Sequence, residues 1–275
     1  MTRKAFVAGW PIKHSRSPKI HRFWLERHAI DGDYCPEAVP PEEIDAFLRG
    51  IAGRGYVGGN VTLPHKETAF RACAVATPVA SRLEAVNTLW FEHGRLNGDN
   101  TDVYGFAANL DERAPRWRSG RTALVIGAGG ASRAVLQALI DAGFRSVVLL
   151  NRTVARAETL ARHFGSPVEA GGLDLLSEVL PFADLIINAT SAGLHDGDGL
   201  VVPWKAARPG AIATDLVYVP LVTPFLQVAQ ATGLTIVDGL GMLLYQAAPG
   251  FERWFGVRPT VDAELRALIV ADIGG

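Results

Sequence analysis

The sequence predicts an α/β protein of two α/β domains with a cleft between them, the second a doubly wound parallel sheet covered by helices. Three features of the chain support this prediction. The second half holds five short apolar runs rich in valine, isoleucine and leucine, which suit a parallel sheet buried on both faces. Helical patterns separate several of these runs. A glycine-rich turn joins the first run to the helix after it.

The first of these runs is "RTALVIGA", Arg121–Ala128, which closes on glycine. The next helix is predicted because four apolar residues then recur on one face, namely Val135, Leu136, Leu139 and Ile140. Further strands are predicted at Ser146–Asn151, Asp184–Thr190, Ala211–Tyr218 and Leu234–Asp238, and further helices at Val154–Phe164 and Pro224–Thr232. This alternation is typical of a nucleotide-binding domain.

The first hundred residues alternate in a similar way. Strands are predicted at "KAFVAG", "DYCPEAV", "YVGGNVTL" and "NTLWFEH", and helices begin near Pro18, Pro41 and Lys66. The segment after Gly241 is helical again. We therefore expect a first domain at residues 1–102, rejoined by C-terminal helices in 240–275, and a second domain at 103–239. The polar segment Asp111–Arg121, interrupted by a proline, is the predicted linker region.

Composition limits the function of the chain. Its 275 residues, 48% hydrophobic and 20% charged, are enough for two domains with a substantial core. Lys plus Arg total 27 against 28 for Asp plus Glu, so no overall field favours nucleic acid or an anionic membrane, and small molecules are the expected partners. Cys35 and Cys73 are too few for a disulfide scaffold or a clustered zinc site, and no metal is expected. Without a signal peptide or a membrane-length apolar run, the protein is expected to be soluble and cytoplasmic.

The clearest chemical signal is the turn "GAGGASRA", Gly127–Ala134, where the strand gives way to the helix. Gly127 permits a tight turn, Gly129 lets the backbone approach a pyrophosphate, and the helix N-terminus favours that anion. Ser132 stands where the usual fingerprint has its third glycine. The strand before the turn and the helix after it still favour a dinucleotide site over an empty turn. The predicted contacts are Gly127, Ala128, Gly129, Gly130 and Ala131.

The end of the next strand selects between the two nicotinamide dinucleotides. An NAD site normally carries Asp or Glu there, whereas "NRTVAR", Asn151–Arg156, has no carboxylate. Arg152 and Arg156 can make paired charge-assisted hydrogen bonds to a 2′-phosphate, and Asn151 and Thr153 add neutral donors. A Rossmann-type NADP-binding domain is therefore predicted. The alternative that Arg156 only solvates a helix face stays open.

Six motifs follow one another from residue 9 to about 250: "GWPIKHSRSPKIH", "NVTLPHK", "AVNT", "LNGDNTDVYGF", "NATSAGL" and "DGLGMLLYQA". In this order they resemble the shikimate dehydrogenase family. The resemblance implies reversible NADPH-dependent reduction of 3-dehydroshikimate to shikimate, in the chorismate and aromatic amino acid pathway. Two positions depart from the family pattern. Glu84 stands where glycine is common and Pro78 where polar or acidic residues are usual, so a shifted helix is expected there.

By this resemblance Lys66 is the catalytic lysine and Asp102 its partner at the substrate hydroxyl. Ketone reduction requires a proton on oxygen, so a positioned acid fits the chemistry. Whether Lys66 transfers that proton or stabilises the developing alkoxide stays open. Taken singly, Lys66 would be a helix-start cation, although a lysine is poorly placed at the positive end of a helix dipole. Asp102 taken singly would be a capping carboxylate.

The resemblance also implies the remaining contacts. Ser15 and Ser17 are expected to bind the substrate carboxylate, although Ser17 followed by Pro18 is also typical of a helix N-cap. Further substrate contacts are expected at Thr62, Asn87, Tyr218 and Gln246. The nicotinamide end of NADP is expected at Ala189, Thr190, Leu216, Gly239 and Met242. A core-filling role is nearly as compatible with Met242.

Two other functions are compatible with the same motifs. One is a quinate/shikimate dehydrogenase that uses NAD(P), against which Arg152 and Ser17 speak. The other is a non-catalytic nucleotide sensor on the same fold, against which the joint presence of Lys66 and Asp102 speaks. A homodimer is compatible with the sequence but not indicated by it.

Overall fold

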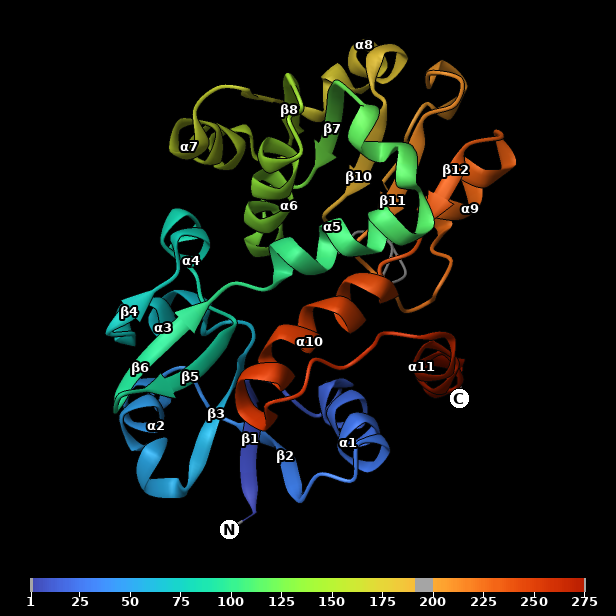
Figure 1. Cartoon of the computed structure of the whole chain (residues 1–275). Coiled ribbons are helices and arrows are strands. Elements are labelled where there is room, and N and C mark those ends of the chain that lie inside the picture. Colours follow the sequence, from blue (N-terminus) through green and yellow to red (C-terminus); the bar gives the residue numbers. More distant parts are fainter. Residues whose placement is uncertain (1, 191–199, 275) are drawn as a thin grey trace. The chain divides into compact units, whose positions relative to one another are not determined.

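The computed structural model describes residues 2–190 and 200–274, and the chain divides into two compact units. The first unit comprises Met1–Asp102 with Leu244–Asp272, and the second Val103–Leu243 with Ile273–Gly275. In Figure 1 the first unit is coloured blue to cyan and ends in red, and the second runs from green to orange. Each unit is built around its own six-stranded sheet.

The first unit holds a mixed sheet, sheet A, in the order β2-β1-β3-β5-β6-β4. Strand β1 is parallel to β2 and β3, and the β3, β5 and β6 neighbours are antiparallel. Its elements are β1 (Arg3–Gly9), α1 (Ser17–Arg27), β2 (Gly32–Ala38), α2 (Ile44–Gly50), β3 (Tyr56–Val61), α3 (Lys66–Ala72), β4 (Val75–Ala76), α4 (Pro78–Leu83), β5 (Thr88–Glu92) and β6 (Arg95–Asp99).

Helix α10 (Leu240–Phe255) packs on sheet A through an aromatic cluster. Trp254 donates its indole N–H to the Leu89 carbonyl at 2.8 Å and lies within ring contact of Tyr34 and His21. Gly58 makes the close approach of Trp254 possible, because a Cβ at this glycine would lie 2.4 Å from the indole nitrogen. Helix α11 (Ala263–Gly274) follows and buries Leu265 and Ile269.

The second unit holds sheet B, in the order β12-β11-β10-β7-β8-β9, with every pair parallel. This is the doubly wound order, in which the first strand lies centrally and the strand order reverses beside it. The elements are α5 (Asp102–Arg113), β7 (Thr122–Ile126), α6 (Gly130–Asp141), β8 (Ser146–Leu150), α7 (Val154–Phe164), β9 (Val168–Gly171), α8 (Leu176–Val179), β10 (Leu185–Asn188), β11 (Ile212–Asp215), α9 (Pro224–Ala231) and β12 (Thr235–Val237).

The α/β class and the doubly wound second sheet confirm the sequence prediction, with differences in detail. Residues 111–121, predicted as the linker, lie inside the second unit. Helix α5 runs on to Arg113, and Pro115–Ser119 form a 3-10 turn that buries Trp117. The chain instead passes between the units at 102/103 and 243/244, inside α5 and α10.

The two departures from the family pattern have a local structural explanation. Helix α4 begins at Pro78, and the Thr77 hydroxyl accepts from the Ala80 N–H at 3.2 Å, so the helix is capped in the ordinary way. Glu84, just after α4, has φ +52 and is in the left-handed region. Glycine adopts that conformation without strain, which is why glycine suits this position.

No helix within residues 2–190 and 200–274 is long and apolar enough to cross a membrane.

Candidate active site

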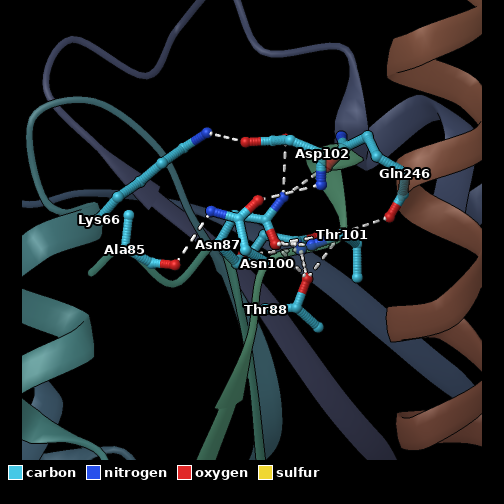
Figure 2. Close-up of polar contacts among 9 residues, drawn as sticks. Lys66, Ala85, Asn87, Thr88, Asn100, Thr101, Asp102 and Gln246 are labelled. Atoms are coloured by element: carbon cyan, nitrogen blue, oxygen red, sulfur yellow. Dashed lines mark hydrogen bonds and ion pairs between the residues drawn. The ribbon is translucent and has the colours of Figure 1, made fainter. Parts of the chain in front are cut away.

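The first unit brings Lys66 and Asp102 into direct contact. The Lys66 ammonium, Nζ, lies 2.5 Å from Asp102 Oδ2, and the two side chains retain 22% and 12% exposure. Lys66 is the first residue of α3, and Asp102 is the first residue of α5. Figure 2 shows the lysine side chain extending toward the carboxylate from a separate segment of the chain. A cation and an anion therefore meet at a place that a small molecule can still reach.

Backbone contacts hold the lysine in place. The Lys66 carbonyl accepts from the Val86 N–H at 2.9 Å, which fixes the start of α3 against the segment before β5. The neighbouring His65 is buried, and its Nε2 lies 2.7 Å from the Val39 carbonyl. Since a carbonyl oxygen can only accept, Nε2 carries the proton, and His65 has a structural role.

The second oxygen of Asp102 is held by Asn87, whose side-chain orientation is fully determined. Asn87 Oδ1 accepts from the backbone N–H of Thr101 at 2.9 Å, so Nδ2 must face the other way. Nδ2 donates to Asp102 Oδ1 at 2.8 Å and to Gln246 Oε1 at 3.0 Å. Asp102 is thus turned so that Oδ2 meets Lys66, as Figure 2 shows.

Three further side chains, to which the sequence analysis assigned no specific contact, support this network. Asn100 donates to the Ala85 carbonyl at 3.0 Å and accepts from the Asp102 N–H at 3.2 Å. Thr101 donates to the Gln246 carbonyl at 2.8 Å, and Thr88 Oγ1 lies 2.8 Å from Asn87 Oδ1. Each of the three lies within two residues of Asn87 or Asp102 in a motif of the sequence. This closeness was the only sequence signal for their role.

A deeper polar chain links β2, β3 and β5. Tyr34 donates its hydroxyl to Asn60 Oδ1 at 2.6 Å, and Asn60 Nδ2 donates to the Asn87 carbonyl and to Thr88 Oγ1, both at 3.0 Å. Burial raises the pKa of Tyr34 well above its usual value. The proton of Tyr34 is therefore retained for Asn60.

The structure corrects the prediction for Ser17. Helix α1 begins at Ser17 itself, with Arg16 at the N-cap and no side-chain cap, so Ser17 is not the N-cap residue. Ser15 Oγ accepts from the Ser17 N–H at 3.4 Å, which leaves the Ser15 proton available to a ligand. Thr62 is half-buried after β3.

The glycine loop of the second unit has the predicted place between β7 and α6. Gly127 has φ +110, and a Cβ there would lie 2.7 Å from Thr190 Cγ2, so the fold itself requires glycine. A Cβ at Gly129 would meet no described atom within 4 Å. Packing therefore does not require glycine at position 129, and without a side chain there the protein backbone could come close to a pyrophosphate.

Hydrogen bonds within the loop show which of its backbone N–H groups already have an acceptor and which could bind an anion. The Ala128 N–H donates to Asn151 Oδ1 at 3.1 Å, and the Gly129 N–H donates to Ser132 Oγ at 3.1 Å. The N–H groups of Gly130 and Ala131, in the first turn of α6, have no intrahelical acceptor and are left for a phosphate.

The segment after β8 places the predicted phosphate-binding residues beside this loop. Asn151 connects the two, since its Nδ2 also donates to the Thr153 carbonyl at 2.9 Å. Arg152, Thr153 and Arg156 are exposed, and neither arginine enters an ion pair with a carboxylate of the described residues. The residues present therefore fit a dinucleotide that carries an additional phosphate.

The predicted nicotinamide contacts lie at the carboxyl edge of sheet B. Gly127 packs on Ala189 and Thr190, and Gly239 packs on Leu216, where a Cβ would lie 2.5 Å from the carbonyl oxygen. Tyr218 follows β11 and is half-buried, and Met242 is half-buried in the first turn of α10. Ser191–Leu194, the rest of the "NATSAGL" motif, lie outside the described residues.

Lys66, Asp102, Asn87 and Gln246 thus form one network within the first unit. Ser15 and Ser17 contact each other at the start of α1, through the Ser17 N–H and Ser15 Oγ. Tyr218 belongs to the second unit. Among the described residues, no group of three or more His, Cys, Asp or Glu side chains could hold a metal ion.

Three family models match the chain in succession. They are the shikimate dehydrogenase substrate binding domain at residues 7–89, shikimate/quinate 5-dehydrogenase at 111–195, and the shikimate 5′-dehydrogenase C-terminal domain at 239–269. A shikimate dehydrogenase (NADP(+)) of Mesorhizobium japonicum is 55% identical over 99% of this chain and 97% of that protein.

Solved structures give the same result. The shikimate 5-dehydrogenase of Thermus thermophilus, in complex with NADP(H) and shikimate, has a TM-score of 0.87 at 38% identity and covers 99% of this chain and 100% of its own. The quinate dehydrogenase of Corynebacterium glutamicum, in complex with NAD, has a TM-score of 0.89 at 25% identity, over 98% of this chain and 99% of its own.

Proposed function

Because the chain belongs to the shikimate dehydrogenase family, we propose that it catalyses the reversible NADPH-dependent reduction of 3-dehydroshikimate to shikimate, a step in aromatic amino acid biosynthesis. The contact between Lys66 and Asp102 carries this proposal. A non-catalytic sensor would have no need of a partly exposed ammonium held against a carboxylate whose other oxygen is bonded by Asn87.

The chemistry requires a hydride at carbon and a proton at oxygen. When the cofactor is bound, NADPH would supply the hydride for ketone reduction and NADP+ would accept it in the reverse reaction. Lys66 Nζ carries three N–H bonds, of which Asp102 takes one, so another can face the ketone oxygen. As electron density grows on that oxygen, the ammonium either donates a proton or stabilises the negative charge. Asp102 keeps Lys66 in place and accepts a hydrogen bond from the substrate hydroxyl in the reverse reaction.

The remaining residues are assigned to binding. The substrate carboxylate is bound by the hydroxyls of Ser15 and Ser17, and the ring by Thr62, Asn87, Gln246 and Tyr218. Gly129 admits the pyrophosphate, and Gly130 and Ala131 donate to it. In domain terms, the first unit provides the substrate contacts other than Tyr218, and the second unit provides Tyr218 and binds NADP.

The proposal is tested by oxidation of shikimate and of quinate, each with NADP and with NAD, followed at the absorbance of the reduced nicotinamide. We expect shikimate with NADP to give the highest kcat/KM. Faster oxidation of quinate with NAD would favour the quinate/shikimate alternative, for which the resemblance to the Corynebacterium enzyme is the supporting observation. No oxidation of either compound would favour the sensor.

Cofactor choice is tested at Arg152. Replacing this exposed arginine with aspartate should remove the preference for NADPH over NADH, because a carboxylate repels the 2′-phosphate and can bind ribose hydroxyls instead. Arg162→Asp is the matched control, because Arg162 lies near the far end of α7, the helix that follows Arg152, and pairs with Glu158. Survival of the NADPH preference in Arg152→Asp would overturn the assignment.

A cytoplasmic location and a homodimer stay predictions. Cell fractionation tests the first, and size-exclusion chromatography tests the second.

A further inference from the structure

A second buried polar network lies at the carboxyl edge of sheet B. It consists of Asn188, Asp215 and Thr223. Asn188 ends β10, Asp215 ends β11, and Thr223 immediately precedes α9. Asn188 and Asp215 are paired in the register of the two parallel strands. Their exposures are 0% and 1%, and that of Thr223 is 4%, so none of the three serves as a surface group.

The hydrogen bonds leave one orientation for the Asn188 amide. Its Oδ1 accepts from the Thr190 N–H at 3.1 Å and from the Thr190 hydroxyl at 2.7 Å. A backbone N–H can only donate, so Oδ1 must face Thr190 and Nδ2 must face Asp215. Nδ2 donates to Asp215 Oδ2 at 3.1 Å.

Asp215 accepts from three directions. Asp215 Oδ2 accepts hydrogen bonds from the Asn188 amide and, at 2.6 Å, from the Thr223 hydroxyl. Oδ1 accepts from the Val217 N–H at 3.0 Å. Burial raises the pKa of Asp215, against the opposing effect of these donors. Both carboxylate oxygens are therefore used within the fold, each toward a different segment.

These bonds connect the segments assigned to the nicotinamide end. Through Asn188 the carboxylate fixes Thr190, and through Val217 it fixes the turn that carries Leu216 and Tyr218. Gly239 packs on the same turn, where a Cβ would lie 2.7 Å from the Asp215 carbonyl oxygen. One side chain thus sets the spacing between two chain segments that come from neighbouring strands.

We infer that Asp215 is a positioning residue for hydride transfer, which holds the Thr190 and Leu216 segments at the separation the nicotinamide ring requires. This inference rests on the proposed function. It predicts a loss of turnover without a loss of affinity for the adenosine half, because Arg152, after β8, binds that half. Displacement of reacting groups by about 1 Å can cost about 100-fold in rate.

The test is Asp215→Asn, which keeps the shape of the side chain. The amide has one oxygen, so in either orientation an NH2 group must face the Val217 N–H or the donors Asn188 and Thr223. We expect kcat for 3-dehydroshikimate reduction to fall about 10- to 100-fold. The primary isotope effect from 4-deuterated NADPH should rise, and the Kd of adenosine 2′,5′-bisphosphate should stay at the wild-type value.

Asp184→Asn is the matched control. Asp184 precedes β10, at the opposite edge of sheet B, and accepts from the N–H groups of Arg121 and Thr122 at 2.7 and 3.1 Å. The same substitution there should lower stability without changing kcat or the isotope effect. A second pair tests the network independently: Thr223→Ala should lower kcat, and Thr223→Ser, which keeps the donating hydroxyl, should restore it.

Wild-type kcat and isotope effect in folded Asp215→Asn would overturn the inference, as would an equal loss of kcat in Asp184→Asn. If Asp215→Asn does not fold, the Thr223 pair decides, and equal wild-type kcat in both variants overturns the inference. A wild-type protein that fails to reduce 3-dehydroshikimate with NADPH would overturn the proposed function and this inference together. The outcomes for the Asp215, Asp184 and Thr223 variants bear on this inference and leave the proposed function unaffected.

Discussion

At the scale of single residues, the position of Lys66 is explained by what surrounds it. A lysine at the first position of a helix gains nothing from the helix dipole. Here the Asp102 carboxylate, 2.5 Å from the Lys66 ammonium, offsets that unfavourable position. The carboxylate is itself held by a hydrogen bond from Asn87. The network therefore places the cation by hydrogen bonds that the helix alone would not provide.

Replacing Lys66 by alanine should lower kcat by about 10²- to 10⁴-fold, with a smaller effect on the KM for shikimate, because the ammonium acts mainly in the transition state. Steady-state kinetics measure both constants. Arg71→Ala is the control, since Arg71 is exposed in the last turn of the same helix and donates to Thr68. Unchanged turnover in Lys66→Ala would contradict the catalytic assignment.

Sequence reasoning could identify the charged pair but not how it is oriented. Lys66 and Asp102 each lie in a recognisable motif, and those motifs predict both residues as members of the site. The amide orientation of Asn87 depends on a backbone N–H of Thr101, a contact that no sequence pattern expresses. Ser17 shows the converse, because a Ser-Pro pair favours an N-cap at the serine, whereas in the structure Arg16 is the N-cap residue and the helix begins at Ser17.

His21 makes stability depend on pH. It is fully buried between aromatic rings, stacked at 3.9 Å on Tyr34, and burial lowers its pKa from 6.5 to about 3. Between these values the unfolded chain binds a proton that the folded chain excludes, so stability falls as pH falls below about 6.5. One such proton changes the free energy of unfolding by up to about 1.4 kcal/mol per pH unit.

His21→Phe should reduce this slope, because phenylalanine keeps a flat ring and removes the titrating group. The measurement is urea unfolding of both proteins at several pH values between about 5.5 and 7.5, above the range where most ordinary carboxyls titrate. His28→Phe serves as the control, since His28 is the C-cap residue of the same helix and is exposed. Equal slopes in wild type and His21→Phe would show that the excluded proton belongs elsewhere.

At the scale of elements, the turn between β7 and α6 shows why Ser132 replaces the usual glycine. Its side chain is fully buried, donates to the Gly127 carbonyl at 2.6 Å and accepts from the Gly129 N–H at 3.1 Å. The hydroxyl thus ties together the two ends of the glycine loop. A third glycine would provide space, but it would not make these bonds.

Ser132→Ala should therefore lower the free energy of unfolding by about 1–3 kcal/mol, since it leaves a buried carbonyl and a loop N–H without their partner. It should also weaken NADP binding, because the loop that presents Gly130 and Ala131 becomes less ordered. Denaturant unfolding and a fluorescence titration with NADPH measure the two effects. Thr159→Ala, an exposed hydroxyl on α7, should change neither, and an equally stable Ser132→Ala would refute the bridging role.

The elements themselves were predictable to different degrees. Long apolar runs such as those of β7 and β8 are clear in the sequence because a strand buried on both faces needs an unbroken run. Strands β4, β6 and β9 were not predicted. They are short or contain glycine and polar residues, as in "RLNGD" of β6, and they exist because a neighbouring strand supplies hydrogen bonds.

At the scale of the whole molecule, the proposed ligands divide between the two units. The residues assigned to the phosphates of NADP lie in Val103–Leu243, and Lys66, Asp102, Asn87 and Gln246 lie in Met1–Asp102 and Leu244–Asp272. A ligand stabilises the part of a protein that its binding orders, and local opening reports that stabilisation segment by segment. Each ligand alone should therefore protect a different set of backbone amides.

Hydrogen exchange measured by mass spectrometry tests this division. NADP alone should slow exchange at Gly127–Ala131 and Asn151–Arg156, and shikimate alone should slow exchange at Ser15–Ser17, Ala85–Thr88 and Asn100–Asp102. In Lys66→Ala the protection by NADP should persist, because no second-unit contact has been removed. Protection of Asn100–Asp102 by NADP alone, with none at the glycine loop, would contradict the assignment of the two units. Protection of the Leu216–Tyr218 turn by shikimate alone would support the Tyr218 contact, since that turn belongs to the second unit.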